Sequence, residues 1–272
     1  MKRFYRTTFV ILGSVSFILT VGFCLQMPLL TGILPPTGSF PIHLFLASFT
    51  ASITASLLWI GFSGELGAVT GGAIDLAVFY VGLMIFQLLS PQHGSQRLLA
   101  GVLLCLVGVI VSLGIFLRFR RYPIEDSRLM PLPVRVSFGV FTIALLLVGS
   151  ALLLHVPNVF AWTLNPMSAA FLGCFFLGSS CYFLYGLFFP RWHNACGQLW
   201  SFLAYDIVLI VPCLLHFATV SSTQLPSLIV NTVILVYSGA LALYYLLIKK
   251  ETRSRLNIAS LSSQAKLPEW SR

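Results

Sequence analysis

The chain has 272 residues, of which 58% are hydrophobic and only 8% are charged. Soluble domains usually carry about 25% charged residues, so this composition cannot cover a water-soluble surface. The formal net charge of +9 does not predict a nucleic-acid partner, because no basic residue lies inside a long apolar run and no aromatic residues alternate with a basic stripe. The composition predicts an all-α integral membrane protein whose main partner is the lipid bilayer.

Eight stretches of the chain are long and apolar enough to cross a bilayer, which takes about 20 residues of helix. They comprise residues 8–26, 43–62, 67–90, 98–117, 136–156, 167–189, 197–220 and 227–248. The connections at 28–41, 91–97, 157–166 and 221–226 are rich in proline and glycine, which end helices. We therefore expect about eight transmembrane helices.

The first predicted span follows a basic N-terminus, as the apolar part of a secretory signal would. Signal cleavage needs small residues in an AxA-like arrangement, but the large Phe23 comes directly before Cys24. This pattern also differs from a lipoprotein cysteine site. We expect the segment to be retained as the first span.

The distribution of lysine and arginine predicts the orientation of the chain. Three basic residues precede the first span, five lie in residues 118–135, one is Arg191 and six follow the last span, whereas Arg97 alone lies on the opposite side. Because 15 of the 16 lysines and arginines are on one side, we expect this side, with both termini, to be cytoplasmic. We expect the protein in the cell membrane. An odd number of spans would separate the two terminal clusters.

The two halves of the chain show similar sequence features at an offset of about 125 to 131 residues. Arg6-Thr-Thr-Phe9 corresponds to Arg135-Val-Ser-Phe138, and the Phe45-Leu-Ala-Ser-Phe49 segment after Pro41 corresponds to Phe171-Leu-Gly-Cys-Phe175 after Pro166. The pattern predicts two four-helix repeats in parallel orientation, residues 1–117 and 136–250, because an even number of spans keeps the orientation of each copy. A basic linker, 118–135, would join them. The tail, 251–272, is expected to be mostly disordered and drawn to anionic lipid, or to act as a docking segment.

The segment Phe160-Ala-Trp-Thr-Leu-Asn-Pro-Met-Ser-Ala-Ala-Phe-Leu-Gly173 precedes and opens the sixth predicted span. It resembles a tryptophan, leucine, proline and alanine pattern found before a span in uncharacterised bacterial multi-pass membrane proteins. The resemblance covers mainly the second half of the chain, since the first half has Pro35 and Pro36 in place of the aromatic pair. It implies no activity.

Asp75 and Asp206 are the only acidic residues within the predicted spans, in the third and the seventh. An aspartate at the centre of a membrane helix costs about 3 kcal/mol, so such residues usually face the protein interior or a water-filled cavity. No lysine or arginine within a span could neutralise them. We expect each to be protonated, to hold a cation or to share a proton with the other. The alternative is a structural role, with each aspartate bonded to Thr70, Tyr205, Ser201 or a backbone carbonyl.

Three further residues near these acids have local predictions. Gly67 and Gly71 precede Asp75 on the same helical face, where they would let another backbone approach closely. Pro212 follows Asp206 by six residues and predicts a kink near the midpoint of the seventh span, because it removes a backbone donor.

The sequence gives no pattern for a metal, a cofactor or a catalytic site. Four of the five histidines (His43, His93, His155 and His216) map to the outer side, with His193 inside, but no pair has the HxxxH spacing. The six cysteines form no CxxC pair. HExxH, GxSxG, Walker and GxGxxG motifs are also missing. The tryptophans and most tyrosines lie near span ends and are interpreted as belt residues.

The leading functional hypothesis is a transporter or channel-like protein for a small solute or ion, with Asp75 and Asp206 as the proton- or cation-coupling groups. A second hypothesis is a non-catalytic membrane scaffold or accessory subunit that organises a membrane protein partner or a homo-oligomer. The third is a redox or lipid-modifying enzyme that uses the outer histidines. The sequence favours a protein that is not an enzyme.

Overall fold

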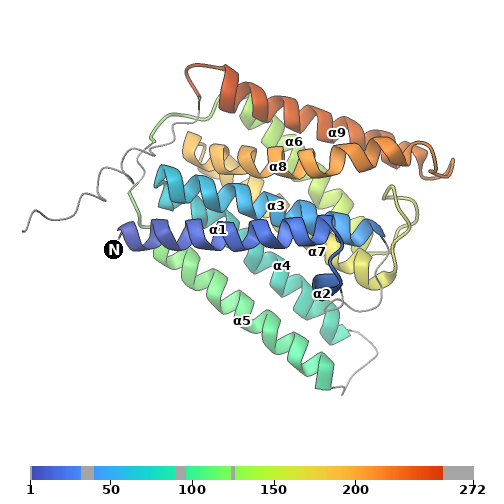
Figure 1. Cartoon of the computed structure of the whole chain (residues 1–272). Coiled ribbons are helices and arrows are strands. Elements are labelled where there is room, and N and C mark those ends of the chain that lie inside the picture. The colour runs from blue at the N-terminus through green and yellow to red at the C-terminus, as the bar shows by residue number, and fades with distance from the viewer. Residues whose placement is uncertain (1, 32–39, 90–95, 124–125, 254–272) are drawn as a thin grey trace, which may run out of the picture.

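The computed structural model describes residues 2–31, 40–89, 96–123 and 126–253. Within them, eight helices are long and apolar enough to cross a membrane, so the chain is an all-α, multi-pass membrane protein. The predicted fold class and the predicted number of about eight spans are both confirmed. The long helices are α1 (Lys2–Cys24), α3 (Phe40–Ser63), α4 (Val69–Leu89), α5 (Gln96–Phe119), α6 (Leu132–Leu153), α7 (Pro166–Phe188), α8 (Trp192–His216) and α9 (Leu225–Leu243) (Figure 1). Three short elements accompany them: α2 (Pro28–Thr31), the 3₁₀ turn η1 (Leu66–Ala68) before α4, and the π-helical turn η2 (Tyr244–Ile248) after α9.

Helix α8 differs most from its predicted span. It begins at Trp192, five residues before position 197, and ends at His216. Hydropathy missed its first turn, residues 192–196, because this turn contains two polar residues, His193 and Asn194, that are buried and not exposed to lipid. Pro212 therefore lies four residues before the end of α8 and not near its midpoint. A kink at this residue stays a prediction.

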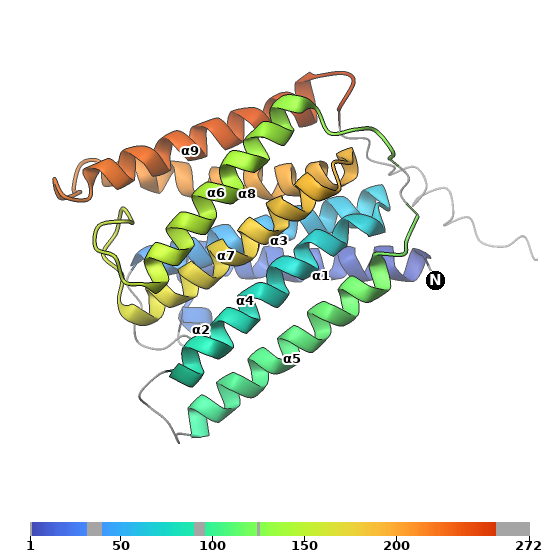
Figure 2. The ribbon, with the colours of Figure 1, turned by 180° about the vertical axis from the view of Figure 1, so that it is seen from behind.

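Four helices form the centre of the bundle and four lie around them. Helix α3 packs along α8, and α4 packs along α7. Each outer helix covers one of these: α1 packs on α3, α5 on α4, α6 on α7 and α9 on α8. Figures 1 and 2 show α5 and α9 at opposite edges of the bundle. Apolar side chains such as Ile18, Leu104, Ile143 and Val233 are more than half exposed on the outer helices, where lipid would cover them.

Small and hydroxylated residues allow the helices to approach closely. A Cβ at Gly149 would lie 2.9 Å from the backbone oxygen of Gly173, and a Cβ at Gly173 would lie equally close to the Gly149 oxygen, so α6 and α7 touch at their backbones.

Helix α1 is joined to α3 by Arg6, which donates to the carbonyls of Gly61 at 3.0 Å and Phe62 at 2.8 Å. The first predicted span is thus an integral part of the packed bundle.

The segment around residues 160–173 has a structural role that explains its composition. Phe160 and Trp162 are buried and pack on Phe45 of α3, with ring centroids 4.9 and 5.4 Å away. Asn165 caps α7 by accepting a hydrogen bond from the backbone of Ser168 at 2.8 Å. The aromatic residues thereby fix the connection to the core while the Asn-Pro pair starts the helix.

Several aromatic residues interpreted as a membrane belt lie inside the protein instead. Trp59, Trp162 and Trp192 are 5%, 9% and 1% exposed. The belt interpretation is wrong for these three, because their large rings bury more surface against neighbouring helices than at the headgroup layer.

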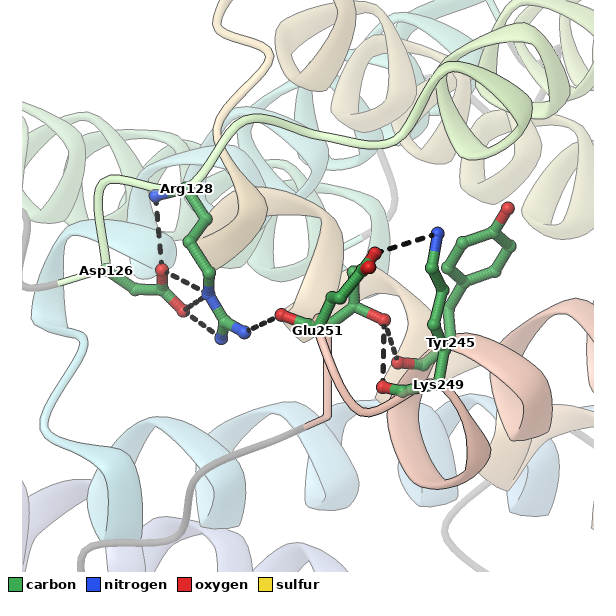
Figure 3. A network of polar contacts seen from close by, with 6 residues as sticks. Asp126, Arg128, Tyr245, Lys249 and Glu251 are labelled. Carbon is green, nitrogen blue, oxygen red and sulfur yellow. Dashed lines mark hydrogen bonds and ion pairs between the residues drawn. The ribbon is translucent and has the colours of Figure 1, made fainter.

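The basic segments meet at one end of the bundle. The backbone N–H of Trp192 donates to the carbonyl of Arg128 at 2.8 Å, and Arg118 donates to the Tyr5 hydroxyl at 3.2 Å. The Arg128 guanidinium also bonds the Asp126 carboxylate and the carbonyl of Glu251 (Figure 3). The linker, the Arg191 loop and both ends of the described chain thus share one end, as the charge count predicts. The predictions for Pro35, Pro36, His93 and the tail from residue 254 lie outside the described residues.

Candidate functional site

A cavity of about 550 Å³ lies among the central helices and reaches the outer ones. Its lining extends from Ala68 and Val69, near the basic end, to residues 159–161 in the connection before α7 and Pro226 in the first turn of α9, at the opposite end. Most of the wall is apolar, with polar groups from α3, α4, α7, α8 and α9. Asp75 and Asp206 both line this cavity.

Asp75 lies where α4 and α7 approach each other. Ser179 of α7 donates to its Oδ2 atom, with a long oxygen to oxygen distance of 3.4 Å. The preceding residue must be glycine, because a Cβ at Gly178 would lie 2.6 Å from the backbone oxygen of Asp75 and would overlap its carboxyl group. The side chain of Asp75 is half-buried and open to the cavity.

Asp206 lies deeper, between α8 and α9, and is only 5% exposed. The hydroxyl of Ser238 donates to its Oδ2 atom at 2.8 Å, whereas its Oδ1 atom has no hydrogen-bond partner in the described part of the chain. Ser238 also lies 2.7 Å from the carbonyl oxygen of Ile234 and 3.2 Å from that of Leu235, so three acceptors compete for one hydroxyl proton. One carboxyl oxygen is thus buried without a partner beside the cavity.

Further polar groups of α8 face the same space. Gln198 is 1% exposed, and neither end of its amide has a partner among the described residues. Ser201 bonds Ser56 of α3 and donates to the carbonyl of Ser52 at 3.2 Å. With Tyr205, these residues follow the three- to four-residue spacing of one helical face. Helix α8 thus presents a polar stripe to an otherwise apolar cavity.

Two of the structural partners proposed from the sequence for the acids, Thr70 and Ser201, are wrong. Thr70 bonds the Tyr185 hydroxyl at 3.0 Å and the carbonyl of Gly67 at 2.6 Å, and Ser201 bonds α3. The carboxyls are bonded to Ser179 and Ser238 instead. The orientation of each helix about its own axis decides this choice, and apolar helices give little signal for it.

Of the two glycines before Asp75, Gly67 has a backbone neighbour, since an added Cβ would lie 3.8 Å from the Tyr122 oxygen, whereas Gly71 differs from the prediction. Gly71 receives the ring of Tyr182, because a Cβ there would overlap that ring. A side chain and not a backbone therefore approaches, and the close backbone contact occurs at Gly178 instead. Tyr182 lines the cavity and does not belong to a membrane belt.

Sequence reasoning missed Gln198, Ser179, Ser238 and Tyr182 as cavity residues. One signal was available for Gln198, an amide side chain in an apolar segment. Gln198 precedes Ser201 by three residues and Tyr205 by seven, which places all three on one helical face. Serines gave no comparable signal, because most hydroxyls in these helices bond a carbonyl of their own helix, as Thr232 does with Leu228.

The outer histidines do not gather into a ligand set. His216 stacks on Trp162, with ring centroids 4.8 Å apart, and its Nε2 atom lies 2.9 Å from the carbonyl oxygen of Ala161. His43 is buried near the start of α3. Within the described ranges, no group of three or more metal-ligating side chains could hold an ion. An enzyme based on these histidines has no support from this geometry.

A second polar cluster, at the basic end, is structural. Burial opposes ionisation of Asp126, but hydrogen bonds from the Arg128 side chain and backbone, and its charge, lower the pKa of the Asp126 carboxyl. Burial raises the pKa of Glu65, which is 5% exposed, and a backbone hydrogen bond from Asp126 offsets part of this effect. These carboxyls have partners and lie outside the cavity.

Comparison of this chain with protein-family models, with curated proteins and with solved structures finds no match. The resemblance of residues 160–173 therefore stays a prediction. What the structure supports without further assumption is a polytopic membrane protein with two carboxyls in one central cavity.

Proposed function

We propose that the protein transports a small solute or ion across the membrane and couples this movement to protonation of Asp75 and Asp206. The observation that carries the proposal is that both carboxyls line one cavity among the central helices. Carboxyls within a membrane protein are costly to bury and mark ion, substrate or proton pathways. A cavity that holds both allows a ligand and a proton to compete for them.

The hydrogen bonds of Asp206 support a site that exchanges a proton. The hydroxyl of Ser238 has one proton for its nearest acceptors, the Ile234 carbonyl and the Asp206 carboxyl, with the Leu235 carbonyl farther away. When Asp206 is protonated, it donates to Ser238, which then donates to Ile234. When it is ionised, Ser238 turns its proton to the carboxylate and a ligand cation can occupy the free Oδ1 atom.

We further propose that the bundle consists of two four-helix repeats related by an axis along the membrane normal. The packing supports this, because exchanging α1, α3, α4 and α5 with α6, α7, α8 and α9 turns each principal helix pair into another such pair. Asp75 and Asp206 lie on the corresponding helices α4 and α8. Transporters commonly bind their substrates at such a repeat interface. The basic end is the cytoplasmic end in this proposal.

A scaffold is the second candidate, because both acids also connect helices. Asp206 joins α8 to α9 through Ser238, and Asp75 joins α4 to α7 through Ser179. A scaffold of this kind would hold a membrane protein partner or a second copy on its apolar outer helices.

Proton flux in liposomes distinguishes the two candidates. The purified full chain is reconstituted with a trapped pH dye, and outward gradients of inorganic cations, organic cations and neutral solutes are applied in turn. We expect at least one solute to drive proton flux, with about tenfold lower rates in Asp75→Asn and Asp206→Asn. Asp126→Asn, outside the cavity, is the matched control and should retain the rate. Equal flux in the wild type and the double Asn variant for every solute would exclude transport coupled through these acids.

A further inference from the structure

We propose that the ligand of the central cavity is a lipophilic organic cation, a monovalent onium or amine with a bulky apolar or aromatic body. This inference rests on the proposed function for its physiological use, but the binding site itself follows from the charge, the wall and the size of the cavity. Each of these three properties excludes another class of ligand.

The charge of the cavity favours a cation. Asp75 and Asp206 are its acidic groups, and no lysine, arginine or histidine lines it within the described ranges. An anion would therefore meet two carboxyls with no compensating charge in a medium of low dielectric constant. A monovalent cation can replace one proton and leave the charge of the site unchanged.

Beside the cavity lie buried polar atoms that have no partner in the described part of the chain. They are the Oδ1 atom of Asp206 and both ends of the Gln198 amide, on residues that are 5% and 1% exposed. Buried polar groups are nearly always hydrogen-bonded, so unpartnered ones beside a cavity indicate a ligand or water. Each is buried, and a rotation of its side chain toward the cavity would supply a directional contact for the polar head of a substrate.

The wall of the cavity is aromatic, which favours an organic ion over a small inorganic one. Nine rings line it, namely Phe9, Phe141, Phe160, Phe175, Phe176, Tyr182, Phe183, Phe202 and Tyr205. Ring faces attract cations within about 6 Å, and most strongly when water is excluded. Metal ions such as Ca²⁺ instead need about six to eight oxygen ligands around one point. The side-chain oxygens that line this cavity are distributed over five helices.

The size of the cavity agrees with this class of ligand. Its volume of about 550 Å³ lies within the range of about 300–1,000 Å³ of sites that bind drug-sized molecules. A bare alkali cation would fill only a small part of this volume, and the rest of the apolar cavity would stay empty or hold water.

Binding of two ions that share a shape and differ in sign tests the proposal. The full chain is placed in nanodiscs of zwitterionic lipid, and equilibrium binding of tetraphenylphosphonium and tetraphenylborate is measured against empty nanodiscs at pH 8 and pH 5. We expect saturable binding of the phosphonium alone. It should weaken about tenfold in Asp75→Asn or Asp206→Asn and weaken at pH 5, where protons compete. Asp126→Asn should bind as the wild type does.

A second variant tests the location without changing any charge. An added Cβ at Gly72, which lines the cavity, meets no atom within 4 Å, so the Leu side chain of Gly72→Leu would occupy cavity space. We expect this variant to fold and to bind the phosphonium about tenfold more weakly. Gly139→Ala, on α6 and outside the lining, is the control.

Three results would overturn the inference: equal binding of the borate, phosphonium binding unchanged in both Asn variants, or unchanged binding in folded Gly72→Leu. Failure of the proposed function is distinguishable from these. If the protein binds the phosphonium selectively but no solute drives proton flux, the proposed coupled transport is refuted and the ligand class stands. If an inorganic or neutral solute drives proton flux but the phosphonium does not bind selectively, the ligand class is refuted and coupled transport stands.

Discussion

Single polar residues of this membrane bundle fall into two groups. Most hydroxyls are bonded within their own helix, as Thr142 is to the Phe138 carbonyl and Thr50 to the Leu46 carbonyl. Such bonds cost little to form in lipid, because a carbonyl acceptor is always one turn away. Asp206 and Gln198 are different, since atoms of their buried side chains have no partner in the described part of the chain. Other buried side chains share this property, such as those of Thr54 and Trp192, but Asp206 and Gln198 are the ones that line the cavity.

The close approach of α7 to Asp75 gives a prediction about stability. Gly178→Ala would place a methyl group 2.6 Å from the backbone oxygen of Asp75, and a backbone atom cannot move away as a side chain can. We expect α4 and α7 to be forced apart and the protein to be destabilised by about 1–3 kcal/mol. Thermal unfolding of the purified protein in detergent measures the change.

Gly139→Ala is the matched substitution for Gly178→Ala. It lies within α6, and an added Cβ there meets no atom within 4 Å. Alanine has a higher helix propensity than glycine by about 1 kcal/mol, so the unfolding temperature should stay the same or rise. If Gly178→Ala unfolds at the same temperature as Gly139→Ala, the close packing at Asp75 is refuted.

At the scale of helices, apolar length predicted all eight spans, but it did not predict the ends that are buried in protein. Trp192 and His193 begin α8 inside the core, where hydropathy counts polar residues against a span. The short helix α2 was missed for a related reason, since four residues are too few for a periodic pattern. A single sequence reports how apolar a segment is and not whether lipid or protein surrounds it.

The end of the last helix depends on the linker between the two halves of the chain. Arg128 bonds the Asp126 carboxylate and the carbonyl of Glu251, the third residue after η2 (Figure 3). We expect Arg128→Ala to release this segment, because the carbonyl loses a charged donor that is itself held by a carboxylate. Amide hydrogen exchange of residues 249–253 should become about tenfold faster.

Lys249→Ala provides the control for this measurement. Its ion pair with Glu251 is 3.4 Å long, and the Glu251 side chain is 81% exposed, so solvent weakens the attraction. Exchange in the same segment should change less than in Arg128→Ala. An equal effect of both substitutions would show that Arg128 has no special role.

At the scale of the whole molecule, charge was a better guide than hydropathy. The count of basic residues predicted that the linker, the Arg191 loop and both terminal segments share one end, and contacts of Arg118 and Arg128 join those segments. The pairing of α3 with α8 and of α4 with α7 was beyond prediction, because α3 and α4 are apolar on nearly every face. The presence of two intramembrane acids was visible in the sequence, but their place in one cavity depends on this pairing.

The proposed orientation of the bundle can be tested in intact cells. Two single cysteines are introduced at exposed positions on opposite ends, Arg121→Cys beside the linker and Ser222→Cys between α8 and α9, with the exposed Cys24 changed to serine. Since the sequence predicts 15 of the 16 lysines and arginines on the side of the linker, that end should be cytoplasmic. We expect a membrane-impermeant maleimide to label position 222 in intact cells and position 121 only after permeabilisation. The reverse order would invert the bundle, and labelling of both from outside would contradict a fold in which these two positions lie across the bilayer from each other.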